Sequence, residues 1–292
     1  MPEMPEVEAL RGFLASELVG ATVVRTELAA FSALKTFAVP LTALAGLEVE
    51  RVERRGKFLA IGVDGLWLAF HLARAGWLRW YGVLPATPAR PGKGPLALRM
   101  GFEKPDADAP VGFDLTEAGT QKHLALYVVG ELAEVPGIAS LGPDPLADDF
   151  TEADFAAVLA ANGRTQLKGL LKTQGTFAGI GNAYSDEILQ RAGVSPFKLA
   201  GSLTPDEVAT LYTAVRTELR EAIDRAAGLP PSELKDGKRT HLRVHGKKGQ
   251  PCPACGTPVA EVSFADSFLN YCPGCQTGGK LLADRRLSRL LK

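Results

Sequence analysis

The stretch RTQLKGLLKTQGTFAGIGNAYSDEIL, residues 164–189, reads as two helical runs joined by a glycine-rich connector. Three glycines fall within seven residues of this connector, which allows tight turns and a close approach of its backbone to another surface. Asn182 is expected to cap the second helix, whose exposed N–H groups and dipole favour an anion such as phosphate. An ordinary helix hairpin without a ligand would use the same residues, so both interpretations stay open at this point.

Four cysteines follow in the last 41 residues, as Cys252-Pro-Ala-Cys255 and Cys272-Pro-Gly-Cys275, with sixteen residues between the pairs. Two such pairs can close on one ion with four sulfur ligands in a tetrahedron, and the residues between them can form a hairpin. Four unrelated buried thiols are the alternative. A complete set of four sulfurs leaves no open position, so the pattern predicts one structural Zn²⁺ and no catalytic metal.

Upstream of the helices the sequence is rich in short β-forming runs. A helix predicted over residues 5–18, from apolar residues at helical spacing, precedes them. Turn residues separate the predicted strands, which indicates an antiparallel sandwich or barrel. The strands are expected at 21–28, 47–52, 58–63, 66–73, 77–81, 96–102 and 124–129.

A Gly-, Pro- and Asp-rich stretch at 136–149 marks a boundary, after which the periodicity becomes helical. Helices are predicted at 151–161, 166–173, 183–192 and 205–227, followed by a loop at 228–238. The chain is therefore expected to be an α+β protein. Its predicted parts are an N-terminal sandwich domain with a leading helix (1–135), a helical domain (136–234) and a zinc finger with a basic tail (235–292).

The charges are unevenly distributed along a chain whose formal net charge is zero. From Lys235 to the end, eleven Lys and Arg face four Asp and Glu, so this part carries +7 and the rest −7. A polyanion responds to the local field, which favours DNA contact, although basic tails are often merely solvated. No apolar run approaches the roughly 18 residues of a membrane span, and no signal peptide is recognisable, so a soluble cytosolic protein is expected.

The chain begins Met-Pro-Glu, and removal of Met1 would leave Pro2 as a secondary amine. An α-amino group titrates at about 7.7–8.0, so a neutral fraction exists that can form an iminium with a sugar aldehyde. Glu3 adjoins this amine, and Glu6 lies on the first helical turn. Lys57, in Arg-Arg-Gly-Lys-Phe, opens a strand after a turn and can reach a phosphate or act as an acid. Taken singly, neither feature indicates chemistry, because many proteins begin Met-Pro-Glu and most lysines after a turn are merely solvated.

Together these residues resemble the formamidopyrimidine-DNA glycosylase and endonuclease VIII (Fpg/Nei) family. MPEMPEVE resembles its MPELPEVE start, RRGKFL its hairpin-lysine motif, residues 164–189 its helix–two-turn–helix, and RVHGKKGQPCPACG the entry to its zinc finger. The resemblance implies a bifunctional DNA glycosylase and abasic-site lyase of base excision repair that works on damaged duplex DNA. It further implies a bacterial-type monomer, associated with the nucleoid through DNA binding, without a small-molecule cofactor.

The resemblance also implies roles for single residues. Pro2 would attack C1′ of a flipped-out nucleotide, Glu3 would assist sugar-ring opening, and Lys57 would help the base to leave, before β- and δ-elimination cut the strand. Glu6 matches a second glutamate near the active site. Five residues are expected to contact DNA, namely Glu6, His71, Arg74, Lys168 and Asn182.

Three departures from the family pattern bear on the substrate. Ser267 stands where an arginine usually contacts phosphate, so Asn182 or the basic tail at 280–292 would have to compensate. Arg74 replaces the wedge methionine, and the usual Asp-Pro-Arg-Arg-Phe-Gly loop has no counterpart near 116–122. The stretch 236–242 looks shorter than the loop that covers oxidised guanine, which favours abasic sites and oxidised pyrimidines.

These departures keep a second hypothesis open, a DNA-binding or damage-sensing protein without base excision. A zinc-ribbon RNA-binding protein is a third, which explains the cysteines but not the N-terminus.

Overall fold

The computed structural model describes residues 2–92, 94–264 and 267–283 of the 292. Its contacts divide the chain into two compact units. The N-terminal unit comprises Met1–Ser140 with Ala226–Gly237, and the C-terminal unit comprises Leu141–Arg225 with Lys238–Lys292. The three-part division expected from the sequence stays a prediction.

The N-terminal unit begins with helix α1, Met4–Leu18. Its buried face carries Val7, Leu10, Leu14 and Leu18, at the spacing of one helical stripe. Pro5 stands in the first turn, where its missing N–H costs nothing. The helix predicted over 5–18 is thus confirmed.

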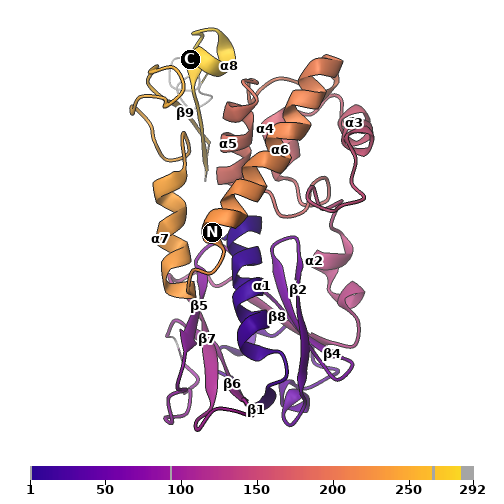
Figure 1. Ribbon diagram of the computed structural model, residues 1–292, viewed down its shortest axis with the longest axis vertical. Coiled ribbons are helices and arrows are strands. Elements are labelled where there is room, and N and C mark those ends of the chain that lie inside the picture. Colours follow the sequence, from indigo (N-terminus) through magenta and orange to yellow (C-terminus); the bar gives the residue numbers. More distant parts are fainter. Residues whose placement is uncertain (1, 93, 265–266, 284–292) are drawn as a thin grey trace. The chain divides into compact units, whose positions relative to one another are not determined.

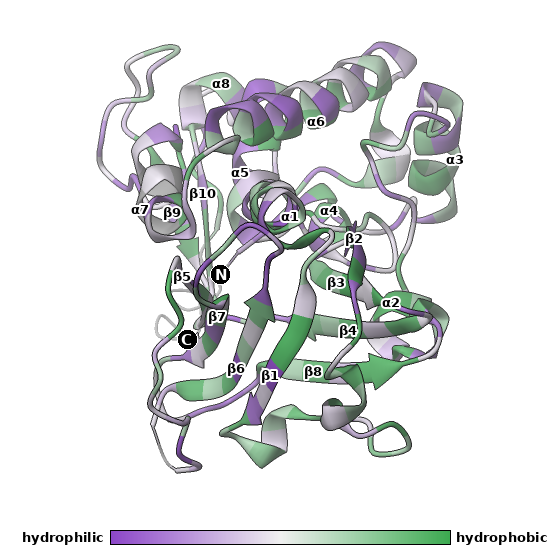
Figure 2. Ribbon diagram, turned by 60° about the horizontal axis from the view of Figure 1, so that its bottom comes forward, coloured by the Kyte–Doolittle hydropathy of each residue, from purple (hydrophilic) through white to green (hydrophobic). Residues whose placement is uncertain are grey.

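Two antiparallel four-stranded sheets follow, in the orders β1-β6-β7-β5 and β2-β3-β4-β8 (Figure 1). Apolar side chains of both sheets and of α1 share one hydrophobic core, so the predicted sandwich with its leading helix is confirmed. Figure 2 shows hydrophobic residues concentrated in these strands and hydrophilic ones along helix α6, Pro205–Ala226. The strands are β1 Thr22–Leu28, β2 Val49–Arg55, β3 Phe58–Val63, β4 Leu66–His71, β5 Gly76–Tyr81, β6 Leu96–Glu103, β7 Val111–Glu117 and β8 Ala125–Val129.

Strand β7 was not expected from the sequence. Gly112 and Asp114 are poor strand formers, and they mask the alternation of the apolar residues around them. Contacts with the neighbouring strand β6 explain why both residues stand in this strand. A Cβ on Gly112 would lie 2.1 Å from the Met100 carbonyl oxygen. Asp114 accepts two hydrogen bonds from Arg99, at 2.7 and 2.8 Å.

Short helices complete the N-terminal unit. They are η1 Phe31–Ala33, η2 Leu41–Leu44, η3 Leu132–Glu134 and α2 Pro136–Ala139. Ile138 and Leu132 pack against Trp67 and Ala69 in a second, smaller apolar cluster on the β2-β3-β4-β8 sheet.

The C-terminal unit is helical and ends in a small hairpin. Thr151 caps its first helix, and Asp154 completes the capping box. The elements are α3 Glu152–Ala161, α4 Leu167–Lys172, α5 Asn182–Arg191, η4 Ala200–Ser202, α6 Pro205–Ala226, β9 Ala260–Ser263, β10 Phe268–Tyr271 and α8 Pro273–Thr277. The four predicted helices and the hairpin between the cysteine pairs are confirmed.

The loop expected at 228–238 is wrong, because helix α7 occupies Pro231–His241. Pro231 suits a first helical position, Glu233 suits the positive end of the helix dipole, and Leu234 is buried in the core of the N-terminal unit. Within the described residues no helix combines the length and the hydropathy that a membrane crossing requires.

Candidate functional site

The start of the chain is held against the first turn of α1. Pro2, Glu3 and Glu6 are all buried, and the two glutamates expose only 2% and 3% of their surface. The Glu3 backbone N–H donates to Glu6 Oε2 at 2.8 Å. Burying carboxyl groups is costly, and sites that move protons are places where such groups gather. The structure therefore brings the three predicted N-terminal site residues together.

Lys57 lies in the turn between β2 and β3. Arg55 pairs with Phe58, which leaves Gly56 and Lys57 as a two-residue turn, and Gly56 has the positive φ (+57°) that such turns need. Lys57 is only 7% exposed, so it is not the solvated surface lysine that its sequence context also allowed.

His71 lies at the end of β4, opposite Phe58 in the strand register. The two rings are 4.8 Å apart, and the Ala73 N–H donates to His71 Nδ1 at 3.1 Å. Burial, and secondarily the positive charge of Lys57, lower the pKa of His71 from 6.5 to about 4. The imidazole is therefore neutral near pH 7.

Arg74 is exposed in the connection between β4 and β5. Ala73 has a left-handed φ of +51°, and the Gly76 N–H donates to the Leu72 carbonyl oxygen at 2.9 Å. A Cβ on Gly76 would lie 2.1 Å from that oxygen, so only glycine closes this turn. The turn leaves Arg74 exposed, and its expected contact with DNA stays a prediction.

The C-terminal unit buries the predicted residue Lys168, which is 5% exposed. Its ammonium lies 2.7 Å from Asp186 Oδ1 and donates to Ser185 Oγ at 2.8 Å and to the Asn182 carbonyl oxygen. Lys168 thus joins α4 to the first turns of α5.

Asn182 does not cap α5, contrary to the prediction. Gly181 is the cap residue, and Asn182 is the first residue of the helix. Its side-chain amide instead donates to the Phe268 carbonyl oxygen of β10 at 2.9 Å. A long-range partner decided its role, which local sequence could not reveal.

Two further acids of α5 were not singled out from the sequence. The buried carboxylate of Asp186 bonds His245 Nδ1 at 2.7 Å through Oδ2, which also accepts the Asn270 N–H at 3.1 Å. The signal in the sequence was two adjacent acids, Asp186 and Glu187, directly followed by the apolar residues Ile188 and Leu189.

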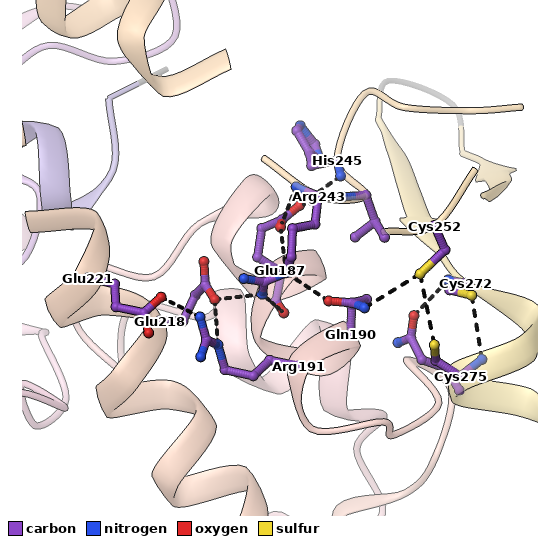
Figure 3. A network of polar contacts seen from close by, with 12 residues as sticks. Glu187, Gln190, Arg191, Glu218, Glu221, Arg243, His245, Cys252, Cys272 and Cys275 are labelled. Carbon is purple, nitrogen blue, oxygen red and sulfur yellow. Dashed lines mark hydrogen bonds and ion pairs between the residues drawn. The ribbon is translucent and has the colours of Figure 1, made fainter. Parts of the chain in front are cut away.

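Glu187 anchors the segment that leads into the cysteine module (Figure 3). Its carboxylate accepts the backbone N–H groups of Arg243, Val244 and His245 at 2.8, 3.0 and 2.8 Å. Burial raises the pKa of Glu187, although these hydrogen bonds act in the opposite direction. Arg243 also bonds Glu218 at 2.6 Å, which ties this segment to α6.

The four cysteines converge on one point. Their sulfur atoms all lie within 4.8 Å of one another, with Cys252–Cys275 at 3.9 Å and Cys255–Cys272 at 3.3 Å. Four Zn–S bonds of about 2.3 Å in a tetrahedron would place the sulfurs about 3.8 Å apart. The donor set therefore fits a zinc ion. Gln190 of α5 donates to the Cys252 sulfur at 3.7 Å, which joins the site to the helical part.

Ser267 stands at the base of the β9–β10 turn, where its carbonyl oxygen accepts the Phe264 N–H at 2.7 Å. Most of the basic tail that was expected to compensate for the missing arginine, residues 284–292, lies outside the described residues.

The whole chain is similar to known proteins. The formamidopyrimidine-DNA glycosylase of Symbiobacterium thermophilum is 35% identical over 98% of this chain and 93% of its own. The chain belongs to the formamidopyrimidine-DNA glycosylase family. Family models agree, with that family's N-terminal domain at residues 1–123, its H2TH domain at 141–230, and the "zinc finger found in FPG and IleRS" at 249–278. The Fpg/Nei resemblance and the fold class are thereby confirmed.

Solved structures of Fpg proteins share the fold. The MutM (Fpg) protein of Thermus thermophilus superposes with a TM-score of 0.77 at 32% identity, over 96% of this chain and all of its own. A Lactococcus lactis Fpg in complex with THF-DNA and an inhibitor gives 0.81 at 26% identity, over 94% and 100%.

Proposed function

We propose that this Fpg-family protein is a bifunctional DNA glycosylase and abasic-site lyase of base excision repair that uses Pro2 as its nucleophile. Family membership carries the glycosylase function. The observation that carries the mechanism is the burial of Glu3 and Glu6 at the chain start, directly beside Pro2.

In the processed chain the Pro2 nitrogen is a secondary amine, whereas with Met1 retained it is an unreactive amide. The amine forms a bond to C1′ as the bond between C1′ and the base breaks, and the base leaves with a proton. Glu3 protonates the sugar-ring oxygen, which opens the ring and leaves an iminium on Pro2. Loss of the C2′ proton then expels the 3′ phosphate, a second elimination expels the 5′ phosphate, and water releases the sugar fragment.

Lys57 and His71 form the second part of the proposed site. A buried ammonium in a tight turn is suited to stabilise the departing base or a flanking phosphate. The neutral His71 imidazole next to Phe58 adds a hydrogen-bonding group without a competing positive charge. Glu6 is proposed to position Glu3, whose backbone N–H it accepts.

DNA is proposed to be held by Asn182 and by the positive end of α5, which favours a phosphate. Lys168 supports that helix end through its hydrogen bonds to Asn182 and Ser185, and Arg74 is proposed to face the base opposite the lesion. One structural Zn²⁺ on the four cysteines would keep the hairpin in place. Similar Fpg structures were solved with abasic-site DNA, which supports a damaged-DNA partner.

Abasic sites and oxidised pyrimidines are the proposed preferred substrates. The proposal rests on the stretch Asp236–Leu242, which looks shorter than the loop that covers oxidised guanine in the purine-directed members of the family. Most of this stretch lies in α7. We further propose that the protein works as a monomer in the bacterial cytoplasm, on duplex DNA and without a small-molecule cofactor.

A second candidate function is DNA binding without base excision. Ser267 and Arg74 favour it, since the usual phosphate-binding arginine and the apolar wedge are both absent from those positions.

Borohydride trapping on DNA with an abasic site separates the two functions. Reduction of the iminium should link the processed protein covalently to DNA. Chains with Met1 retained should give no adduct, and Pro2→Gly should give much less. DNA binding without any adduct in the processed wild type would favour the second function.

A further inference from the structure

Strand β10 of the zinc-finger hairpin begins with an aromatic side chain that faces solvent. Leu269, Asn270 and Tyr271 are buried, whereas Phe268 is 39% exposed. The Phe268 ring stacks on the His245 imidazole, with centroids 5.4 Å apart and planes inclined by 18°. The pair is therefore a flat, layered surface at the base of the hairpin turn.

This surface is rigidly supported from beneath. Asp186 bonds His245 Nδ1 at 2.7 Å and is itself paired with Lys168 at 2.7 Å. The His245 backbone N–H donates to Glu187 at 2.8 Å. A pre-ordered aromatic pair loses little side-chain entropy when a ligand stacks on it.

The same surface adjoins an end of a helix that favours anions. The Asn182 side chain donates to the Phe268 carbonyl oxygen, which places the backbone of Phe268 at the N-terminus of the ten-residue helix α5. A flat apolar ring beside the positive end of a helix dipole matches both parts of a nucleotide, because a base stacks on the ring and the dipole favours a phosphate.

We propose that Phe268, backed by His245, is a stacking platform for an unpaired base of the bound DNA. The proposal rests on DNA being the ligand, as argued above, and it adds a binding site for a base. It also accounts for Ser267, since stacking at the next residue supplies grip that the usual arginine would otherwise provide. The protein is expected to favour DNA with an unpaired region next to the lesion.

Binding of a single-stranded oligonucleotide that carries 2-aminopurine tests this platform. Phe268→Leu should weaken binding about fivefold to thirtyfold, corresponding to about 1–2 kcal/mol of base stacking. It should also abolish the quenching of 2-aminopurine fluorescence. Phe268→Trp should restore both. The matched control is Phe37→Leu, since Phe37 is 79% exposed in the N-terminal unit, and its affinity should equal that of the wild type.

Binding to a fully paired, undamaged duplex should change less than twofold in Phe268→Leu, because no base is free to stack. Bound zinc and thermal stability are compared first, and Phe268→Trp provides the folded aromatic variant if Phe268→Leu loses structure. Equal affinity of Phe268→Leu and wild type for the single strand would overturn the proposal. Equal weakening on single strand and duplex, or failure of tryptophan to restore binding, would do the same.

Borohydride trapping keeps this test separate from the proline chemistry. Phe268→Leu at saturating abasic-site DNA should still form the covalent adduct at the wild-type yield. If the wild type forms no adduct, but Phe268→Leu binds the single strand more weakly than the wild type does, the catalytic proposal fails and the stacking platform stands.

Discussion

Both units of the molecule bury ionisable side chains, but they do so in different places. In the C-terminal unit the buried charges join separate elements: Lys168 of α4 meets Asp186 of α5, and Asp186 meets His245 of the following segment. The N-terminal unit also has such a pair, Arg99 of β6 with Asp114 of β7, but it buries Glu3, Glu6 and Lys57 at the first residues of the chain and in a two-residue turn.

This difference distinguishes buried charges that hold elements together from buried charges that are proposed to take part in the reaction. Ion pairs between elements fix how those elements pack, and removing one partner leaves a buried charge uncompensated. Glu3 and Glu6 are buried directly beside the proposed nucleophile Pro2, and buried ionisable groups of this kind gather where protons are transferred. We therefore assign the reaction to the N-terminal unit and the fixed support of a DNA-binding surface to the C-terminal unit. The predictions below test this assignment, from the largest expected effect to the smallest.

Removal of zinc should affect only the C-terminal unit, which contains the four cysteines. A structural zinc site contributes about 10–16 kcal/mol of apparent binding free energy in small fingers, so chelation should unfold the cysteine module and abolish DNA binding. The three tryptophans, Trp67, Trp77 and Trp80, all belong to the N-terminal unit, so their fluorescence should stay unchanged. Unchanged DNA affinity after verified loss of metal would contradict the assignment.

Glu3→Gln should lower single-turnover base excision about a hundredfold to ten-thousandfold, the usual range for loss of a general acid or base. The matched control is Glu8→Gln in α1, the helix that follows Glu3. Glu8 bonds Arg11 and Arg54 at 2.6 and 2.8 Å, which is a packing role. A control variant as impaired as Glu3→Gln would show that the loss reflects disturbance of α1.

Asp186→Asn should destabilise the full chain by about 3–5 kcal/mol, because it leaves Lys168 buried without its carboxylate. Its control is Lys198→Met, which removes the more exposed ion pair with Glu207 and should cost less than about 1 kcal/mol. Urea unfolding of both variants measures the contrast. Equal losses of unfolding free energy in the two variants would mean that the buried Lys168–Asp186 pair matters no more to stability than the more exposed pair.

The smallest expected effect concerns His71. An NMR titration should find its pKa near 4, and Lys57→Met should raise that pKa only part of the way to 6.5, since burial is the larger cause. Because the depressed pKa favours the unfolded chain at low pH, the stability contributed by neutral His71 should be complete above pH 6.5. It should be lost as the pH falls towards 4. An unperturbed pKa would place His71 in solvent.

The sequence was most informative where local pattern and structure coincide. The apolar stripe of α1, the alternating strands and the cysteine spacing all predicted their elements. It failed where distant residues decide the outcome. Strand β7 was missed because Gly112 and Asp114 are explained by contacts with β6 and not by their neighbours in sequence. Helix α7 was missed because Leu234 packs in a core whose other residues are distant in sequence.

The same limit applies to the site. The N-terminal residues could be singled out because they are adjacent in sequence. Asp186 and His245 could not, because 59 positions separate them. The predicted cap role of Asn182 was wrong, since its side chain bonds Phe268, which is 86 positions away.

The central claim is that the Pro2 nitrogen itself attacks the sugar. Proteolysis of the borohydride-trapped complex, followed by mass spectrometry of the N-terminal peptide, tests it directly. We expect the reduced deoxyribose fragment on a peptide that begins with Pro2, bonded to its α-nitrogen. A fragment found on Lys57 or another lysine, with an unmodified Pro2 peptide in the same sample, would contradict the account.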